Sequence, residues 1–158
     1  MSLTRDAQVC AAGHAEGPAI VLAGPLSFWG GIDAETGRII DHSHPDRGTC
    51  VTGAILVMPG GRGSSSSSSV FAETIRRATG PAGIVLATPD PILTAGALVA
   101  SLLYGTQCPV VVCSIEGLTT GDRLQIGAAP GGGSTVVIVS RARRVVEPAP
   151  IENDGAPH

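Results

Sequence analysis

A run of glycines and serines contains the residues of this chain that are best suited to chemistry. The sequence GGRG at residues 60–63 is followed by six consecutive serines, of which Ser64 is the first. The run comes directly after the apolar residues 54–58 and directly before residues 70–78, which have helical spacing. Glycines let a ligand approach the backbone, and a helix start offers free N–H groups at its positive dipole end. The arrangement predicts an anion-binding turn with the Ser64 hydroxyl at its mouth.

A run of glycine and serine is also typical of a flexible linker between domains. This run, however, separates an expected strand from an expected helix within one short domain. Serines also favour helix N-caps and the turns that precede them. The strand-to-helix setting therefore favours a ligand-binding turn over a tether.

Length and composition indicate one domain with a substantial core, since 43% of the 158 residues are hydrophobic. Aromatic residues make up only 3%, so we expect a core of Val, Ile, Leu and Ala. A formal net charge of −3 and the lack of arginines between stacking aromatics argue against a nucleic-acid partner. With no apolar run of about 18 residues and no signal-peptide pattern, we expect no membrane partner and a cytoplasmic location with free thiols.

The hydrophobic pattern predicts six strands, at residues 19–23, 50–58, 83–87, 110–115, 123–126 and 135–140. One helix is expected over residues 69–79. A second should begin at the N-cap Asp90, with Pro91 at its first position, and end at Gly105. Because this second helix is apolar nearly all round, we expect it to be buried.

The order of these elements predicts an α/β fold with a parallel βαβαβ core, since strands alternate with helices over residues 50–115. The later strands are expected to add to it in antiparallel fashion. We place the domain at residues 19–146, between a flexible N-terminus at residues 1–18 and a disordered tail at residues 147–158, which is rich in breakers.

The Ser64 turn and the segment 88–90 should face one edge of the sheet. Each follows a parallel strand, and ligands of such folds gather at the carboxyl ends of strands. Common motifs do not describe the turn. The chain has no lysine for a phosphate-binding loop, residues 61–63 give only half of a dinucleotide fingerprint, and no Gly-x-Ser-x-Gly elbow is present.

Several motifs resemble the small subunit of aconitase X, a relative of the mobile swivel domain of aconitase-type dehydratases. They are PLSFWGG at residues 25–31, HPDRG at 44–48 and GRGSS at 61–65, with further similarity at 89–99 and 108–112. The resemblance covers roughly residues 24–140. It implies a swivelling β/β/α domain whose added strands form a barrel-like sheet.

The resemblance also implies a hydro-lyase with divided labour. A large subunit, or a fused large domain, would hold an iron or iron–sulfur centre that acts as Lewis acid on the departing hydroxyl. The small subunit would supply a serine base, by position Ser64, for the proton on the carbon beside a carboxylate. Such a base needs N–H groups, a nearby cation and exclusion of water. The turn at Gly63 would supply N–H groups, Arg62 would supply the cation or point to solvent, and Ser65 would bind the carboxylate or cap the helix.

Ser27 and Phe28 either pack a turn or line the cleft and touch substrate. The remaining serines, residues 66–69, we interpret as capping or filler.

The segment that contains His42 and His44 resembles a metal site, but no further ligands follow at a usual spacing, so we expect a loop near the subunit interface. Cys113 fits a core position, and a ligand lent to the large subunit's centre is the alternative. We therefore expect no metal in this chain itself.

Relatives in that family divide by substrate, since some dehydrate cis-3-hydroxy-L-proline and archaeal ones dehydrate mevalonate 5-phosphate. All ten basic residues are arginine, which with many Ala and Gly suggests a GC-rich bacterial genome and favours hydroxyproline, with Δ1-pyrroline-2-carboxylate as product. A phosphorylated substrate would want more basic groups than Arg62 and Arg47. An interaction module without catalytic activity is the alternative from another class.

Overall fold

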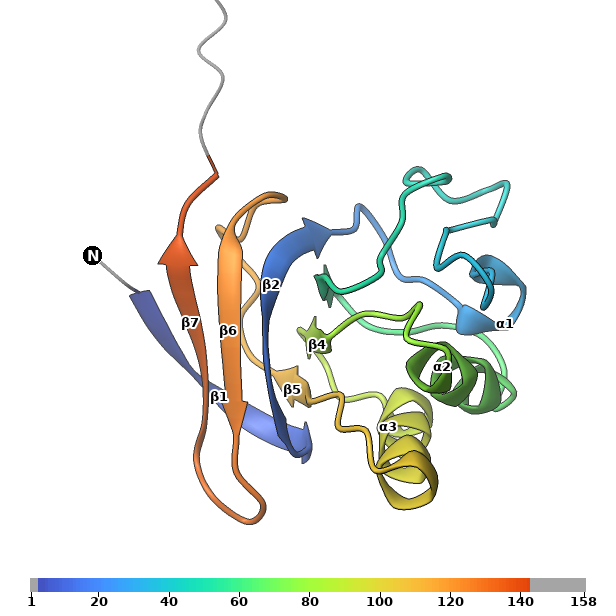
Figure 1. Cartoon of the computed structure of the whole chain (residues 1–158). Coiled ribbons are helices and arrows are strands. Elements are labelled where there is room, and N and C mark those ends of the chain that lie inside the picture. Colours follow the sequence, from blue (N-terminus) through green and yellow to red (C-terminus); the bar gives the residue numbers. More distant parts are fainter. Residues whose placement is uncertain (1–2, 143–158) are drawn as a thin grey trace, which may run out of the picture.

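The computed structural model describes residues 3–142, which form a closed barrel with helices packed on one side (Figure 1). Its elements are β1 (Leu3–Ala11), β2 (Gly13–Val21), α1 (Phe28–Gly31), β3 (Ile55–Met58), α2 (Ser67–Arg76), β4 (Gly83–Leu86), α3 (Pro91–Tyr104), β5 (Val110–Val112), β6 (Arg123–Ala128) and β7 (Ser134–Ser140). Around the barrel the strands follow the order β1-β5-β4-β3-β2-β6-β7.

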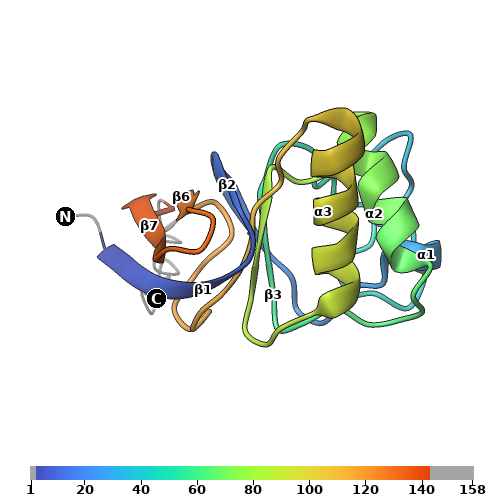
Figure 2. The same ribbon diagram turned by 90° about the horizontal axis from the view of Figure 1, so that it is seen from below.

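One half of the barrel consists of the neighbouring parallel strands β2, β3, β4 and β5. Strands β3 and β4 are buried along their whole length, which explains their continuous apolar sequences. Helices α2 and α3 are the crossovers between β3, β4 and β5, and they lie together outside this half (Figure 2). The predicted parallel βαβαβ core is confirmed.

Strands β1, β6 and β7 form the other half and pair in antiparallel fashion. The prediction of a flexible N-terminus at residues 1–18 was wrong from residue 3 onward, because β1 and most of β2 lie there. The partners of β1 are β5 and β7, about 100 residues or more away in sequence, and most of its exposed positions are polar. Such pairing leaves no strong local signal. The predicted tail at residues 147–158 lies outside the described residues.

Two cores lie on opposite sides of the parallel strands. Along β3, Ile55 and Val57 point into the barrel, whereas Leu56 and Met58 point toward the helices. This alternation follows from the two-residue period of a strand. The barrel core and the helix-facing core together fix the carboxyl ends of the parallel strands in place.

Helix α3 begins and ends as predicted, with Asp90 as N-cap and Gly105 as a left-handed C-cap. The prediction that α3 is buried was wrong, since Leu102 is 85% exposed and Leu103 is 68% exposed. Only the face of α3 that carries Leu93 packs on α2 and the sheet. Within residues 3–142, no element covers the outer face, which carries Leu102 and Leu103. None of the described helices combines the length and the hydropathy that a membrane crossing requires.

Candidate active site

Three loops that follow β2, β3 and β4 meet around a cavity of about 250 Å³. Its lining residues come from all three loops and from the starts of α2 and α3: Leu26, Phe28, Gly61, Arg62, Gly63, Ser67, Pro89, Asp90, Pro91, Ile92 and Leu93. The expectation that the loops after the parallel strands share one edge is therefore confirmed. Carboxyl ends of parallel strands are the usual place for ligands in such folds.

Backbone hydrogen bonds hold these loops together. Leu26 and Gly61 form a parallel bridge, and the N–H of Arg62 donates to the Leu26 carbonyl at 3.5 Å. The N–H and the hydroxyl of Thr88 both lie 3.2 Å from the Pro59 carbonyl. These hydrogen bonds, most of them between main-chain atoms, connect the loops that form the cavity walls.

Glycine is required at two positions of the loop between β3 and α2. Gly63 has φ +105°, a conformation that side chains rarely adopt, and a Cβ there would lie 2.9 Å from Ser27 Cβ. A Cβ on Gly61 would collide with the Asp90 carboxylate. The glycines therefore let the loop pass close to both neighbouring loops.

Ser64 lies on the exposed rim beside this cavity, not in its lining. Its hydroxyl oxygen accepts the Ser66 N–H at 3.3 Å. The backbone N–H groups of Gly63, Ser64 and Ser65 donate no hydrogen bond to any atom of residues 3–142. An exposed hydroxyl thus lies next to three available backbone donors, a combination suited to an anion.

Ser65 is also exposed and absent from the cavity lining. Its carbonyl accepts hydrogen bonds from the N–H and the hydroxyl of Ser68, at 3.2 and 2.8 Å. The N-cap of α2 is Ser66, which makes no side-chain capping bond. The alternative role of Ser65 as a helix cap is therefore wrong, and its hydroxyl remains available to a ligand.

Ser67 is a cavity residue that the sequence interpretation missed, because it was grouped with capping or filler serines. It is only 3% exposed, and its Oγ accepts the Trp29 N–H at 3.2 Å and lies 3.4 Å from Ser27 Oγ. Ser67 precedes the buried Phe71 by four residues, so helical spacing places both on the inner face of α2. That spacing was the available signal.

The aromatic residues of the first loop have different surroundings. Phe28 is fully buried against Phe71, with ring centroids 5.0 Å apart, and it also lines the cavity. Trp29 is 60% exposed. Ser27 donates to the Trp29 carbonyl at 3.0 Å and lies next to Gly63. Both expected roles of Phe28, packing and lining, are therefore present.

Asp90 caps the start of α3 and also lines the cavity. Its Oδ1 accepts the N–H groups of Ile92 and Leu93 at 2.9 and 3.1 Å, while Oδ2 lies over Gly61. Sequence reasoning identified Asp90 as a cap but not as a site residue, although its position after β4 indicated the correct edge.

Arg62 is exposed, and it forms no ion pair with residues 3–142. The pKa of Asp41 is lowered, chiefly by the Ser43 hydroxyl and N–H and only slightly by the charge of Arg62. The guanidinium is therefore free to meet a ligand.

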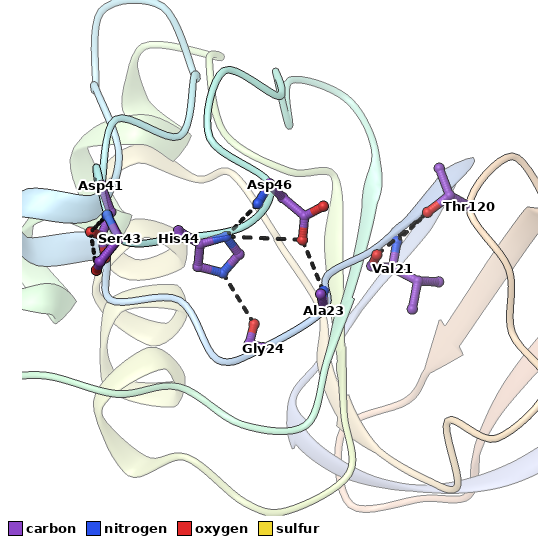
Figure 3. Close-up of polar contacts among 8 residues, drawn as sticks. All are labelled: Val21, Ala23, Gly24, Asp41, Ser43, His44, Asp46 and Thr120. Carbon is purple, nitrogen blue, oxygen red and sulfur yellow. Dashed lines mark hydrogen bonds and ion pairs between the residues drawn. The ribbon is translucent and has the colours of Figure 1, made fainter.

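His44 connects the loop that contains the two histidines to the loop that follows β2 (Figure 3). Its Nδ1 accepts the Asp46 N–H at 3.0 Å, which leaves Nε2–H to donate to the Gly24 carbonyl at 3.3 Å. The Asp46 carboxylate accepts the Ala23 N–H at 2.8 Å. His44 is buried and holds the loop in place, His42 is exposed, and neither lines the cavity.

Within residues 3–142, no group of three His, Cys, Asp or Glu side chains is placed to hold a metal ion. Cys113 packs in the barrel core, where burial raises the pKa of its thiol, and it does not line the cavity. The expected core position of Cys113 is confirmed.

A closed mixed barrel with helices on one side and a cavity at the strand ends defines a swivelling β/β/α domain. The family profile for the aconitase X swivel domain matches residues 4–138, and the chain belongs to this family. Aconitase X from Thermococcus kodakaraensis, solved in its holo form, is 30% identical, with a TM-score of 0.74 over 85% of this chain and 98% of that one.

Curated relatives fall into two groups. The chain is 43% identical over 103 residues to a cis-3-hydroxy-L-proline dehydratase of Hypocrea jecorina and 44% identical over 99 residues to one of Pseudomonas aeruginosa. These matches cover 65% and 63% of the chain, but the chain spans only 17% of either relative's length. It is 40% identical over 119 residues to the phosphomevalonate dehydratase small subunit of Methanopyrus kandleri, which covers 74% of this chain and 84% of that subunit.

Proposed function

We propose that this chain is the swivel component of a hydro-lyase and that its Ser64 removes the substrate proton. The observation that carries the proposal is the exposed Ser64 hydroxyl beside the available N–H groups of residues 63–65, at the rim of the cavity. This is the environment in which a serine alkoxide can be stabilised. The family membership and the names of the relatives support the class of reaction.

The proposed elimination uses the groups of this chain as follows. The Ser64 alkoxide takes the proton from the carbon beside the carboxylate, and the electrons of that C–H bond form the new double bond. The hydroxyl on the next carbon leaves and, with the proton that Ser64 took up, becomes water, which restores the alkoxide. Arg62 and the Ser65 hydroxyl hold the substrate carboxylate and stabilise the negative charge that develops on it, while the free N–H groups of residues 63–65 stabilise the Ser64 alkoxide.

A large partner, either a separate subunit or a fused domain, completes the proposed enzyme. The described residues do not fit a metal, so we assign the iron or iron–sulfur centre to that partner, where it would act as Lewis acid on the leaving hydroxyl. Closure of the partner over the exposed rim would also exclude water from Ser64, which a serine base requires.

The proposed substrate is cis-3-hydroxy-L-proline, whose dehydration yields Δ1-pyrroline-2-carboxylate after tautomerisation. The 43% and 44% identities to dehydratases of this name favour it. Mevalonate 5-phosphate is the second candidate, supported by the 40% identity to the Methanopyrus kandleri small subunit.

The experiment is an assay of the assembled enzyme, with this chain and its large partner produced together. The Ser64→Ala variant should lose at least about a hundredfold in kcat with both substrates offered in turn, while the iron content and the complex stay intact. Ser66→Ala is the matched control, because Ser66 is an exposed neighbour without a side-chain capping bond. Near-normal activity of Ser64→Ala would contradict the proposed role, and an inactive wild-type complex would favour a non-catalytic interaction module.

A further inference from the structure

The cavity has two charged lining residues of opposite sign, Arg62 and Asp90. The other side chains of its lining are apolar, apart from the hydroxyl of Ser67. A ligand with one carboxylate and one cationic group matches this pair of charges. A ligand with several negative charges would instead meet the Asp90 carboxylate, and like charges brought together disfavour binding.

Asp90 is held in one orientation. Its Oδ1 accepts two hydrogen bonds from the first turn of α3, at 2.9 and 3.1 Å. Its Oδ2 lies over the Cα of Gly61 and accepts no hydrogen bond from residues 3–142. Because Asp90 is half-buried, its charge acts more strongly than it would in open solvent.

Capping alone does not require a carboxylate at this position. Only Oδ1 is used for the cap, and Asn, Ser or Thr caps a helix about as well as Asp. The carboxylate adds a second, negatively charged oxygen beside Gly61, at a position where the backbone carries no side chain. Compared with a neutral capping residue, Asp90 therefore offers one additional acceptor, which is available to a cation in the cavity.

We propose that Asp90 binds the ring ammonium group of a zwitterionic hydroxy amino acid, while Arg62 and the Ser65 hydroxyl bind its carboxylate. This inference rests on the proposed function. It makes Asp90 the residue that selects a cyclic amino acid over a phosphorylated hydroxy acid.

The test measures the KM and kcat of the assembled enzyme with cis-3-hydroxy-L-proline for wild type and Asp90→Asn. Asparagine keeps the shape and the capping oxygen but removes the charge. We expect KM to rise about tenfold or more, since a hydrogen bond between charged groups is worth at least that factor, with a much smaller change in kcat. Asp6→Asn is the control, because Asp6 is an exposed residue of β1 in the antiparallel half of the barrel.

A second readout uses cis-3-hydroxytetrahydrofuran-2-carboxylate, which has a ring oxygen in place of the ring nitrogen, as a competitive inhibitor. Its inhibition constant should stay the same or fall in Asp90→Asn, because the compound is an anion without a cationic group for Asp90 to bind. A loss of affinity that is equal for both ligands would overturn the inference and indicate a merely structural effect.

The two proposals fail in different ways. If wild type dehydrates cis-3-hydroxy-L-proline while Asp90→Asn and Asp6→Asn have the same KM, the inference is overturned and the proposed function stands. If the wild-type complex acts only on mevalonate 5-phosphate, or on neither compound, the proposed substrate and the inference fall together. A thermal transition of Asp90→Asn close to that of wild type is expected, since the cap of α3 is retained.

Discussion

Ser67 is the buried member of the run of six serines. Its replacement by alanine tests the structure, because the sequence alone does not distinguish Ser67 from the serines beside it. The change removes the acceptor of the Trp29 N–H, at 3.2 Å, and the weaker contact with Ser27 Oγ, at 3.4 Å. A buried donor left without its partner costs about 1–3 kcal/mol. Alanine returns about 0.5 kcal/mol through its higher helix propensity, so the net loss should be about 0.5–2.5 kcal/mol.

The assay is thermal unfolding of the chain, in which a loss of this size lowers Tm by about 1–10 °C. Ser69→Ala is the matched control, because Ser69 is exposed on the same helix and its hydroxyl makes no hydrogen bond within residues 3–142. The propensity gain is common to both variants, so their difference isolates the hydrogen bonds of Ser67. Ser69→Ala alone should gain about 0.5 kcal/mol or stay unchanged.

Trp29 gives a second readout, since it is the only tryptophan of the chain. Without the Ser67 hydroxyl, the α1 segment loses its bond to α2, and acrylamide should quench the Trp29 fluorescence more strongly. Equal Tm values for Ser67→Ala and Ser69→Ala, with unchanged quenching, would refute the placement of Ser67 against the cavity loop.

Two further predictions concern the stability of the fold. Burial raises the pKa of Asp122, but hydrogen bonds from two backbone N–H groups and an ion pair with an arginine outweigh it, so the pKa lies below its ordinary value of 3.8. Asp122 therefore stabilises the fold above its ordinary pKa of 3.8, and this stability is lost as the pH falls through the lowered pKa. In urea titrations, Asp122→Asn should lose about 1–3 kcal/mol at pH 7, and its difference from wild type should shrink as the pH is lowered below 3.8. A wild-type advantage that stays constant over that range would contradict this assignment. On α3, the double change Leu102→Ser and Leu103→Ser should alter the free energy of unfolding by less than about 1 kcal/mol, whereas Leu93→Ala, at a buried position, should cost about 2–5 kcal/mol; similar losses for both would mean that the outer face of α3 is covered in the folded chain.

Much of the parallel half of the fold could be read from local patterns. The apolar run of β4 and the cap Asp90-Pro91 at α3 gave these two elements nearly their observed bounds, because burial on both faces and capping are encoded in neighbouring residues. The strand predicted at residues 50–58 was found as β3, but β3 begins only at Ile55. β1 could not be recognised in the same way. Its stability comes from pairing with β5 and β7 and from closing the barrel, which neighbouring residues do not record.

Local patterns also misjudged the outer face of α3, where they predicted more burial than the structure shows. An all-round apolar helix predicts burial on every side, yet only one stripe of α3 meets the sheet and α2. Composition determines what a side chain would gain by burial, while the number of neighbouring elements decides whether the burial takes place.

The sequence alone determined where the candidate site begins: a glycine turn between a strand and a helix, with Ser64 after it, because backbone freedom and helix N–H groups are local properties. Only the tertiary structure decided which side chains share the cavity. It buried Ser67, left Ser64 and Ser65 on the rim, and brought the carboxylate of Asp90 over Gly61. These outcomes depend on how three loops, far apart in the chain, pack at the ends of adjacent strands, and that packing is set by the register of the whole barrel.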